Sequence, residues 1–558
     1  MCCKYYLLCM PDTSLTITPV RLGPLPILRE VVKALGIEDA FLKHVRHDPR
    51  DKIPVSQTLI IALYNVMTER CPLYQMDEWA LQRGLVPAEF AANFNDDRMG
   101  RALDRLFCGD RAAIITDIVL SALKVYDIDV NRIHNDSTTV TLFGDYAAYP
   151  NTQAAKPLHG HNKDHRPDLK QLVFSLSVAG DGAIPLYFKV WDGNITDDTT
   201  HLSNWMALRT LVGHAKFIYV ADCKLCVRET MGFIQTEGGF FVTIMPETRQ
   251  EITRFKQWIQ DNSPVWKNAL HLPDTKRQDG TPRVFWTMDS PFLSSEGYRI
   301  VWIKSLDKQR EDEQRRTARI ERTENALKPL SDTVHTNKNT LEQKTIAILK
   351  ENRTGEYFDW QITHDVEQTF KQCSRGRPTP STEFRKIEKA VYRLTWCQKA
   401  DRIQYDARYD GIFPVITNRQ DPAAEILGYY KYQPHLEKRH EQLKSVYNVA
   451  PVFLKNPQRI EALLSLYFLG MLVTSLIERK ARKEMKNRGV EAIPIYPEGR
   501  NCKAPTADKL LALFSDVRLQ HIGKDGRVIQ TVPDSLTKVQ RTVLGLVGIR
   551  PEAYFDPG

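Results

Sequence analysis

The sequence predicts an α/β protein in which a mixed sheet follows a helical region and is interrupted by a long insertion. Three observations support this fold class. Apolar residues recur at helical spacing over residues 20–110. β-Branched and aromatic residues gather in short runs between residues 125 and 250. An interval of short strands and charged helices then separates these runs from a second helical stretch near residue 425.

The composition is that of an ordinary globular protein. Of the 558 residues, 42% are hydrophobic and 26% are charged, which excludes a disordered or low-complexity chain. Lys and Arg outnumber Asp and Glu by 77 to 68, and this net charge of +9 fits a polyanionic partner, although many enzymes reach it too. Ten scattered cysteines make no disulfide framework, so we expect a reducing, cytoplasmic environment.

No membrane segment is expected. The first residues, MCCKYYLLCMPDT, contain only a short apolar run without a cleavage signal. The longest apolar stretch, residues 462–477, is shorter than the roughly 20 residues that cross a bilayer. We interpret it as a buried core helix.

A helical N-terminal domain is predicted at residues 1–115. PLPILREVVKALGI and VSQTLIIALYNVMTE repeat apolar residues at i, i+3, i+4 and i+7, and Pro54 and Pro72 separate the helices. Such a domain can bind DNA ends, or it can serve packing or dimerisation. Helical periodicity alone leaves both interpretations open.

The strands of the core follow in the order β-β-β-α-β-α-β. The first three strands are predicted at VNRIHNDSTTVTLFG, LVFSLSV and IPLYFKV. Gly180–Gly182 is a hairpin signal between the second and third of these strands. FIYVAD and FFVTIM supply the last two, with helical segments near residues 201–211 and 227–235. The core is placed at residues 125–250 and 425–490.

The insertion is placed at residues 251–424. It alternates the strand runs RVFWTM, YRIVWIKS, AVYRLTW and IFPVITN with one charged stretch, residues 307–352, that predicts a solvated helix pair. Residues 491–558 form a C-terminal region in which we recognise no motif.

Two aspartates stand at strand positions where a carboxylate is costly. Asp136 interrupts RIHNDSTTV, and Asp222 ends the apolar run FIYVAD. A buried charge persists only when it is paired, hydrogen-bonded or bound to a metal ion. Taken alone, Asp222 is better explained as the cap of the next helix.

A third carboxylate lies in the segment YYKYQPHLEKRHEQLK. Tyr430, Gln433, Glu437 and Lys444 follow the spacing Y-x2-Q-x3-E-x6-K, which places them along one face of a single helix. Glu and Lys beside Tyr on one face fit a helix that faces a metal-and-phosphate site better than an amphipathic core helix.

These blocks together resemble the DDE transposases of bacterial insertion sequences. The resemblance is specifically to the superfamily that has an RNase-H-like core, a β-strand insertion and the motif Y-x2-R-x3-E-x6-K around its glutamate. Asp136, Asp222 and Glu437 match the three acidic positions of that superfamily. Gln433 departs from the motif, since it stands where the family has Arg, and Cys223 stands where small residues are more usual.

Two further blocks also resemble the family, and the resemblance covers roughly residues 20–480. GHNKDHRPDLKQL, residues 160–172, is similar to a block that follows the first strand. The triplet Asp192–Asn194 with Asp197 is similar to another. Lys163, Arg166 and Lys170 make the first of these blocks a basic loop suited to phosphate contact.

The resemblance implies an RNase-H-like fold and metal-dependent cleavage and joining of double-stranded DNA at the ends of an element, by a homodimer. Asp136, Asp222 and Glu437 would hold two Mg²⁺ ions, for which Mn²⁺ could substitute, because hard divalent ions prefer carboxylate oxygens. Tyr430, Gln433 and Lys444 would contact the DNA.

Other interpretations stay open. His159, His161 and His165 form H-x-H-x3-H, which invites a zinc site. The absence of Arg at position 433 keeps open a catalytically silent DNA-binding derivative, although the intact set of three acidic residues favours an enzyme. A metal-dependent nuclease without strand transfer would carry the same acidic residues. The sequence has no P-loop motif, so no ATP dependence is expected.

Overall fold

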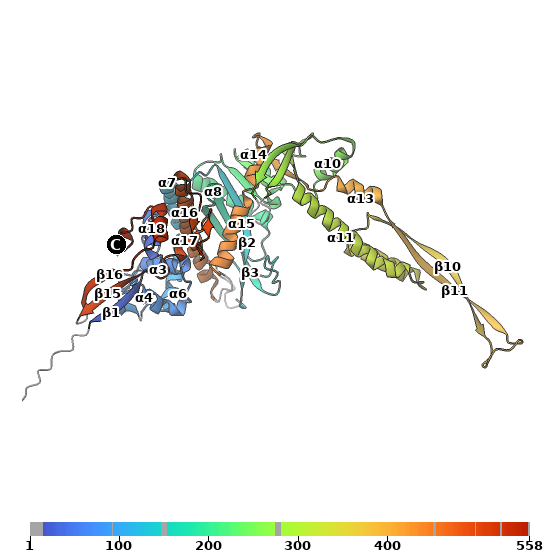
Figure 1. Cartoon of the computed structure of the whole chain (residues 1–558), viewed down its shortest axis with the longest axis horizontal. Helices are drawn as coiled ribbons and strands as arrows, with labels where there is room; N and C mark the ends of the chain where they lie inside the picture. The colour runs from blue at the N-terminus through green and yellow to red at the C-terminus, as the bar shows by residue number, and fades with distance from the viewer. Residues whose placement is uncertain are drawn as a thin grey trace, which may run out of the picture. The chain divides into compact units, whose positions relative to one another are not determined.

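The fold is that of a computed structural model and is described for residues 15–91, 93–146, 153–273, 281–449, 454–496, 498–524 and 527–555. The first fourteen residues of the predicted N-terminal domain, with their three cysteines, lie outside the described residues. The chain forms two compact units, one of Met1–Val242 with Tyr429–Gly558 and one of Thr243–Gly428. Figure 1 labels their elements. The second unit lies where the sequence predicts the insertion.

The first unit contains a series of helices over residues 25–126, which includes the region that the apolar spacing predicts to be helical. The side chains of Asn95 and Asp110 cap two of them by accepting the N–H groups of Arg98 and Ala113. Pro54 stands directly before another. The helices are α1 (Leu25–Ala34), α2 (Ile37–His44), α3 (Val55–Met67), η1 (Leu73–Gln75), α4 (Met76–Gln82), α5 (Ala88–Ala91), α6 (Asp96–Cys108) and α7 (Arg111–Tyr126).

The long apolar helix α16 (Pro457–Asn487) packs against α3 and α6. The stretch 462–477, predicted as a core helix, occupies its middle and is almost entirely buried. Within the described part of the chain, α16 alone is long and apolar enough to cross a membrane, but 83% of its most apolar window is buried inside the protein. The predicted N-terminal helices and the core therefore share one compact unit.

The first unit contains a mixed sheet in the order β4-β3-β2-β5-β6. β2 pairs antiparallel with β3 and β3 with β4, whereas β2 and β5 are parallel. Strands and helices alternate in the predicted order. They are β2 (Arg132–Leu142), β3 (Lys170–Ala179), β4 (Pro185–Trp191), η2 (Asp197–Thr199), α8 (His201–Val212), β5 (Ile218–Ala221), η3 (Cys223–Leu225), α9 (Arg228–Thr236) and β6 (Phe240–Ile244).

Aromatic rings hold α16 on this sheet. Phe188 of β4 stacks on Phe468 of α16 with ring centroids 4.7 Å apart, and on Phe174 of β3 at 5.4 Å. Burying an aromatic side chain stabilises a fold by about 1.5–3 kcal/mol, and a ring pair adds about 1 kcal/mol. The sheet that carries Asp136 is therefore anchored from one side by the core helix.

Two glycines allow the loop before β3 to lie close to the turn after β4. Leu158 and Gln171 exchange two backbone hydrogen bonds, and the Gln171 side-chain amide donates to the backbone oxygen of Gly193 at 2.7 Å. A Cβ at Gly193 would lie 2.0 Å from the Gln171 backbone oxygen, and one at Gly160 would lie 2.2 Å from the Gly193 oxygen. Only glycine fits at these two positions, which belong to the blocks recognised in the sequence.

The C-terminal residues return to the beginning of the described chain. β1 (Thr16–Arg21) pairs antiparallel with β15 (Arg518–Lys524), which also pairs with β16 (Arg527–Pro533). The Tyr554 hydroxyl donates a hydrogen bond to the backbone oxygen of Gly23. The other elements of this region are β13 (Ile493–Pro494), β14 (Asn501–Cys502), α17 (Ala507–Ala512), α18 (Lys538–Val547) and η5 (Ala553–Phe555).

The second unit contains an antiparallel sheet in the order β12-β9-β8-β7. Phe255 of the helix α10 stacks on Trp302 of β9 with centroids 3.7 Å apart, which packs the helix on the sheet. The sequence predicts these strands except β7. The elements are α10 (Gln250–Asp261), β7 (Lys267–Leu272), β8 (Arg283–Asp289), β9 (Arg299–Ser305), α13 (Ala400–Ala407) and β12 (Ile412–Thr417).

A helix pair and a long hairpin complete the second unit (Figure 1). The charged stretch forms α11 (Leu306–Ser331) and α12 (Lys338–Glu351), as predicted. The hairpin consists of β10 (Phe358–Gln372) and β11 (Phe384–Gln398), of which the sequence predicts only a part of β11. A hydrophobic cluster joins the helices to the base of the hairpin and includes Leu327, Leu341, Leu349, Phe358 and Leu394.

The close approach at Gly193 yields a stability prediction. Gly193→Ala should destabilise the protein by several kcal/mol, because the new methyl group overlaps the Gln171 backbone and forces the loop off β3. Thermal unfolding measures the effect. Gly232→Ala is the matched control, since Gly232 lies inside α9 with open space around its Cβ and should gain up to about 1 kcal/mol of helix propensity. Equal melting temperatures for the two variants would contradict the prediction.

Candidate active site

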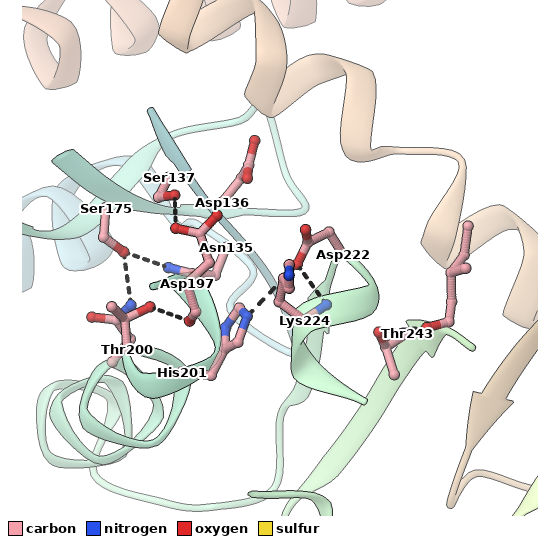
Figure 2. A network of polar contacts seen from close by, with 12 residues as sticks. Asn135, Asp136, Ser137, Ser175, Asp197, Thr200, His201, Asp222, Lys224 and Thr243 are labelled. Carbon is pink, nitrogen blue, oxygen red and sulfur yellow. Dashed lines mark hydrogen bonds and ion pairs between the residues drawn. The ribbon is translucent and has the colours of Figure 1, made fainter. Parts of the chain in front are cut away.

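Asp136 lies in the middle of β2, and Asp222 directly follows the last residue of β5. The two strands are parallel, and His134 pairs with Val220. Continued by two residues, this register sets Asp136 level with Asp222 on the same face of the sheet. Figure 2 shows both residues within one polar network. The pairing of β2 with β5 thus brings together two of the three predicted acidic residues.

Two basic side chains flank the Asp136 carboxylate. Lys163 Nζ lies 3.9 Å from its Oδ1, and His440 Nε2 lies 3.7 Å from its Oδ2. Burial raises the pKa of Asp136 to about 6; Lys163 acts against this rise, while Asp222 and Asp197 add to it. Burial lowers the pKa of His440 to about 3, so this histidine is neutral at pH 7.

Asp222 caps the short turn η3, which is the simpler role that the sequence allows. Its carboxylate accepts the backbone N–H of Lys224 at 3.1 Å, and His201 Nε2 lies 3.7 Å from its Oδ1. Burial pushes the pKa of Asp222 upward, but the contacts with His201 and Lys224 outweigh burial and leave the pKa below its usual value. Asp222 is therefore ionised at neutral pH.

Asp197, in η2, is a further carboxylate of this network. The Ser137 hydroxyl donates a hydrogen bond to it, and Lys163 Nζ lies 3.6 Å from its Oδ2. Lys163 also donates to the backbone oxygen of Ser137 at 2.6 Å. A single ammonium group is thus shared between Asp136 and Asp197.

Sequence reasoning did not identify Lys163, His201 or His440 as neighbours of the carboxylates. Lys163 and Asp197 stand in the two blocks that resemble transposase motifs, so that resemblance was the available signal. Nothing comparable marks His201 or His440, because their closeness to Asp222 and Asp136 depends on how α8 and a later helix pack.

The loop of residues 160–172 is held against β2. The Thr141 hydroxyl donates to Asp164 at 2.9 Å, and the Asn162 amide donates to the Thr141 hydroxyl at 3.2 Å. Lys444 Nζ forms an ion pair with Asp164 Oδ1 at 2.6 Å. Lys444, predicted to contact DNA, therefore contacts this loop in the structure.

The two cations predicted for the same loop lie at its surface. Arg166 is paired with Asp168 through two hydrogen bonds of 2.9 and 2.8 Å. Lys170 lies 3.6 Å from the carboxylate of Asp145. Their contact with DNA stays a prediction, and surface ion pairs of this kind are weak enough to exchange for a phosphate.

The predicted single helix through Tyr430 and Lys444 is broken into three segments, so that prediction was wrong. They are α14 (Ala423–Tyr430), α15 (Gln433–Glu441) and the π-helical turn η4 (Gln442–Val446). Pro434 explains the break, because proline has no N–H to donate to the Tyr430 carbonyl and its ring clashes with that oxygen. Tyr430 belongs to the helix before the break.

α15 lies against β2 through residues on one face. The Gln433 amide donates to the Asn135 backbone oxygen at 3.2 Å, and its oxygen lies 3.1 Å from His134 Nδ1. One face of a helix holds residues at i, i+4 and i+7, and His440 on this face reaches Asp136. Glu437 lies between Gln433 and His440 in the sequence and on the same face of the helix, and its side chain is exposed. The third predicted carboxylate is thus carried by a helix that touches the strand of the first.

Gln433 contacts protein and not an open surface. Its side chain is only 8% exposed, and both atoms of its amide group have partners on β2. The role predicted for Gln433 in DNA binding is therefore not available to it in this arrangement.

Tyr430 lies within electrostatic reach of all three acidic residues. Burial raises the pKa of its hydroxyl well above the usual range, and Asp222, Glu437 and Asp136 each raise it further. The hydroxyl is therefore protonated and able to donate a hydrogen bond close to these carboxylates.

The donor chemistry of the site suits a hard divalent ion, because Asp136, Asp197, Asp222 and Glu437 offer carboxylate oxygens. Among the described residues, however, no group of three or more His, Cys, Asp or Glu side chains is gathered closely enough to hold a metal ion. This also holds for the histidines of the H-x-H-x3-H motif. The two Mg²⁺ ions stay a prediction.

A family model described as a domain of unknown function (DUF4277) matches residues 18–120. No curated protein matches the chain in sequence. Among solved structures, the piggyBac transposase synaptic complex with hairpin DNA has a TM-score of 0.25 and 10% sequence identity, covering 85% of this chain and 84% of that chain. A TM-score this low does not establish a shared fold.

The raised pKa of Asp136 predicts a pH dependence of stability. An acid whose pKa is raised from 3.8 to about 6 by folding stabilises the folded state below pH 4, and this stabilisation is lost as pH rises through 6. Asp136→Asn does not titrate, so its stability relative to the parental protein should increase by up to about 3 kcal/mol between pH 4 and pH 7. Thermal melts in a chelating buffer measure this difference.

The control for this prediction is Asp198→Asn, since Asp198 is exposed beside Asp197. Its stability relative to the parental protein should stay constant over the same pH range. Parallel pH profiles for Asp136→Asn and the parental protein would show that Asp136 does not titrate as inferred.

The burial of Gln433 predicts the outcome of restoring the family's Arg. Gln433→Arg would place a charge beside a neutral His134, whose pKa burial lowers to about 3, and should lower the melting temperature by several degrees. It should not steepen the salt dependence of DNA binding. Glu441→Gln changes the net charge by the same amount at an exposed position of α15 and should leave the melting temperature almost unchanged. If DNA binding by Gln433→Arg depended more steeply on salt and its melting temperature were unchanged, residue 433 would contact DNA and not protein.

Proposed function

We propose that the chain is a DDE-type transposase with an RNase-H-like core, which cleaves double-stranded DNA at the ends of an insertion sequence and joins them to a target. The observation that supports this most is the meeting of three elements around β2. Asp136 lies on β2, Asp222 lies level with it after β5, and Glu437 is on the face of α15 that contacts residues 134–136. The sequence blocks that resemble DDE transposases contain the same three carboxylates.

Asp136, Asp222 and Glu437 would hold the divalent cations, Mg²⁺ or Mn²⁺. When bound, such ions activate an attacking oxygen and stabilise the leaving oxygen of a phosphoryl transfer. The carboxylates suit this role because they are hard oxygen donors. A pair of active sites in a homodimer would serve the two ends of an element.

The protein's own residues around the carboxylates have separate tasks. Lys163 balances the charge of Asp136 and Asp197, so that two carboxylates can stay ionised at neighbouring positions. The protonated Tyr430 hydroxyl can donate a hydrogen bond to a phosphate oxygen near the acidic residues. Lys444, Arg166 and Lys170 can exchange their carboxylate partners for the DNA backbone.

Neutralising the acidic residues tests the proposal. Asp136→Asn, Asp222→Asn and Glu437→Gln should each lower DNA cleavage by a factor on the order of 100 or more, because each removes a ligand that supports several kcal/mol of transition-state stabilisation. DNA binding should be retained. The substrate is a duplex carrying the inverted repeats that flank the coding region, and both nicked and joined products are quantified in Mg²⁺.

Asp198→Asn is the matched control for these variants, since it neutralises an exposed aspartate next to Asp197. This variant should cleave DNA at the parental rate.

The reaction products distinguish the competing functions. Cleavage without joined product would identify a nuclease, and binding without cleavage by the parental protein would identify a silent derivative. Near-parental cleavage by any of the three variants would remove that residue from the catalytic set.

A further inference from the structure

The distal part of the hairpin β10–β11 is a two-stranded ribbon without a covering layer. Between residues 363 and 390 no side chain is buried, whereas the base of the hairpin is packed on α11 and α12. An isolated two-stranded hairpin is marginally stable in water. A ribbon this long therefore indicates a partner that it contacts.

The tip of this ribbon, residues 369–387, is basic. It carries one acidic residue, Glu383, and five basic residues, which are Lys371, Arg375, Arg377, Arg385 and Lys386. Lys371 and Arg385 are paired directly across the two strands. Like charges in such a position destabilise a hairpin, so their presence favours a polyanionic partner that neutralises them.

The basic residues of the tip are mostly without a carboxylate partner. Among the described residues, Lys386 forms an ion pair with Glu388 at 2.6 Å, and no ion pair is found for Lys371, Arg375, Arg377 or Arg385. All four are exposed. Their charges can therefore meet an incoming ligand without breaking an internal ion pair.

The opposite face of the tip carries two exposed aromatic rings, together with Lys386 and Gln372, which are paired with them across the strands. Residues paired across the strands alternate between the two faces, and Phe370 and Phe384 therefore share a face that Lys371 and Arg385 do not. Phe370 is 66% exposed and Phe384 is 51% exposed. In the major groove of a duplex, an aromatic side chain such as Phe can contact the thymine methyl group.

We infer that the tip of the β10–β11 hairpin is a DNA-binding arm that enters the major groove of a duplex. A two-stranded β-ribbon fits the major groove, where basic side chains reach the phosphates and apolar side chains contact base methyl groups and sugars. This inference rests on the proposed function for the choice of partner, and it adds a binding surface far in sequence from the acidic residues.

The exposed apolar area argues against a second copy of the chain as the occupant. A stable protein dimer buries about 800 Å² on each partner. Two phenylalanine rings with Val366 offer a smaller surface, since a whole aromatic side chain contributes about 150–250 Å². The four unpaired cations of the tip would also face the same four cations in a symmetric pair.

Neutralising the tip tests the inference in the full-length protein. The arm variant combines Lys371→Gln, Arg375→Gln, Arg377→Gln and Arg385→Gln. Its affinity for a mixed-sequence duplex should fall at least about tenfold at low salt, and the slope of log affinity against log salt should fall by about 0.9 for each phosphate that the arm no longer neutralises. The control variant combines Lys328→Gln, Lys338→Gln, Lys344→Gln and Lys350→Gln on the exposed surface of α11 and α12. It changes the net charge equally and should bind like the parental protein.

The outcomes distinguish failure of this inference from failure of the proposed function. If the parental protein binds DNA and both variants bind equally well, the arm inference is overturned and the proposed function is untouched. If the parental protein does not bind duplex DNA, both are overturned. Cleavage by the arm variant on short end substrates should persist, because its acidic residues are unchanged.

A second pair of variants tests the aromatic face. Phe370→Ser with Phe384→Ser should weaken duplex binding several-fold without changing the salt slope, whereas Ile346→Ser, at an exposed position of α12, should not. The molar mass in solution should be unchanged in both. A change of molar mass with unaltered DNA affinity would show that the tip joins copies of the chain, contrary to the inference.

Discussion

The arrangement of the candidate site depends on the two hydrogen bonds of Gln433. They attach the start of α15 to His134 and to the backbone of Asn135, one residue before Asp136. Because the helix begins there, its later turns lie over β2, and His440 reaches Asp136 while Glu437, on the same face, stays exposed. A buried amide is well suited to this link, since it satisfies one donor and one acceptor without introducing charge. The departure from the family motif at this position thus has a structural role.

Charge balance is the second constraint on the site. Burial raises the pKa of Asp136, the nearby Asp222 and Asp197 raise it further, and such a cluster of carboxylates is tolerated only with cations nearby. Lys163 supplies one, but it can be shared by only two of the carboxylates. His440 and His201 approach the same carboxylates as buried imidazoles, and burial keeps His440 neutral. The site therefore retains net negative charge, which is the condition under which divalent cations bind.

Local sequence patterns predicted most of the elements, and long-range packing accounts for what they missed. Apolar spacing located α1, α3 and α16, and the β2 to β6 strands follow their runs of β-branched residues. The prediction of one continuous helix was wrong at Pro434. Proline is itself a local signal for a helix break, whereas the motif spacing favoured a single helix. Local patterns do not place Lys163 beside Asp136, because its position depends on the hydrogen bonds of a loop 26 residues from Ser137, and only the resemblance of its block to the family marked it. β10 was missed because both faces of its outer part are polar or exposed.

The closure of the first unit by its two ends has a consequence for synthesis on the ribosome. Gly23 and Tyr554, joined by a hydrogen bond, are 531 positions apart, and β1 pairs with β15 over a similar separation. At about 5–20 residues per second, roughly half a minute to two minutes passes between the emergence of β1 and that of its partner strand. During this time the edge of β1 is unpaired, with Leu15 and Ile17 exposed even in the finished fold. A nascent chain held in that state is a natural client for a chaperone, because an open strand edge invites pairing with other chains.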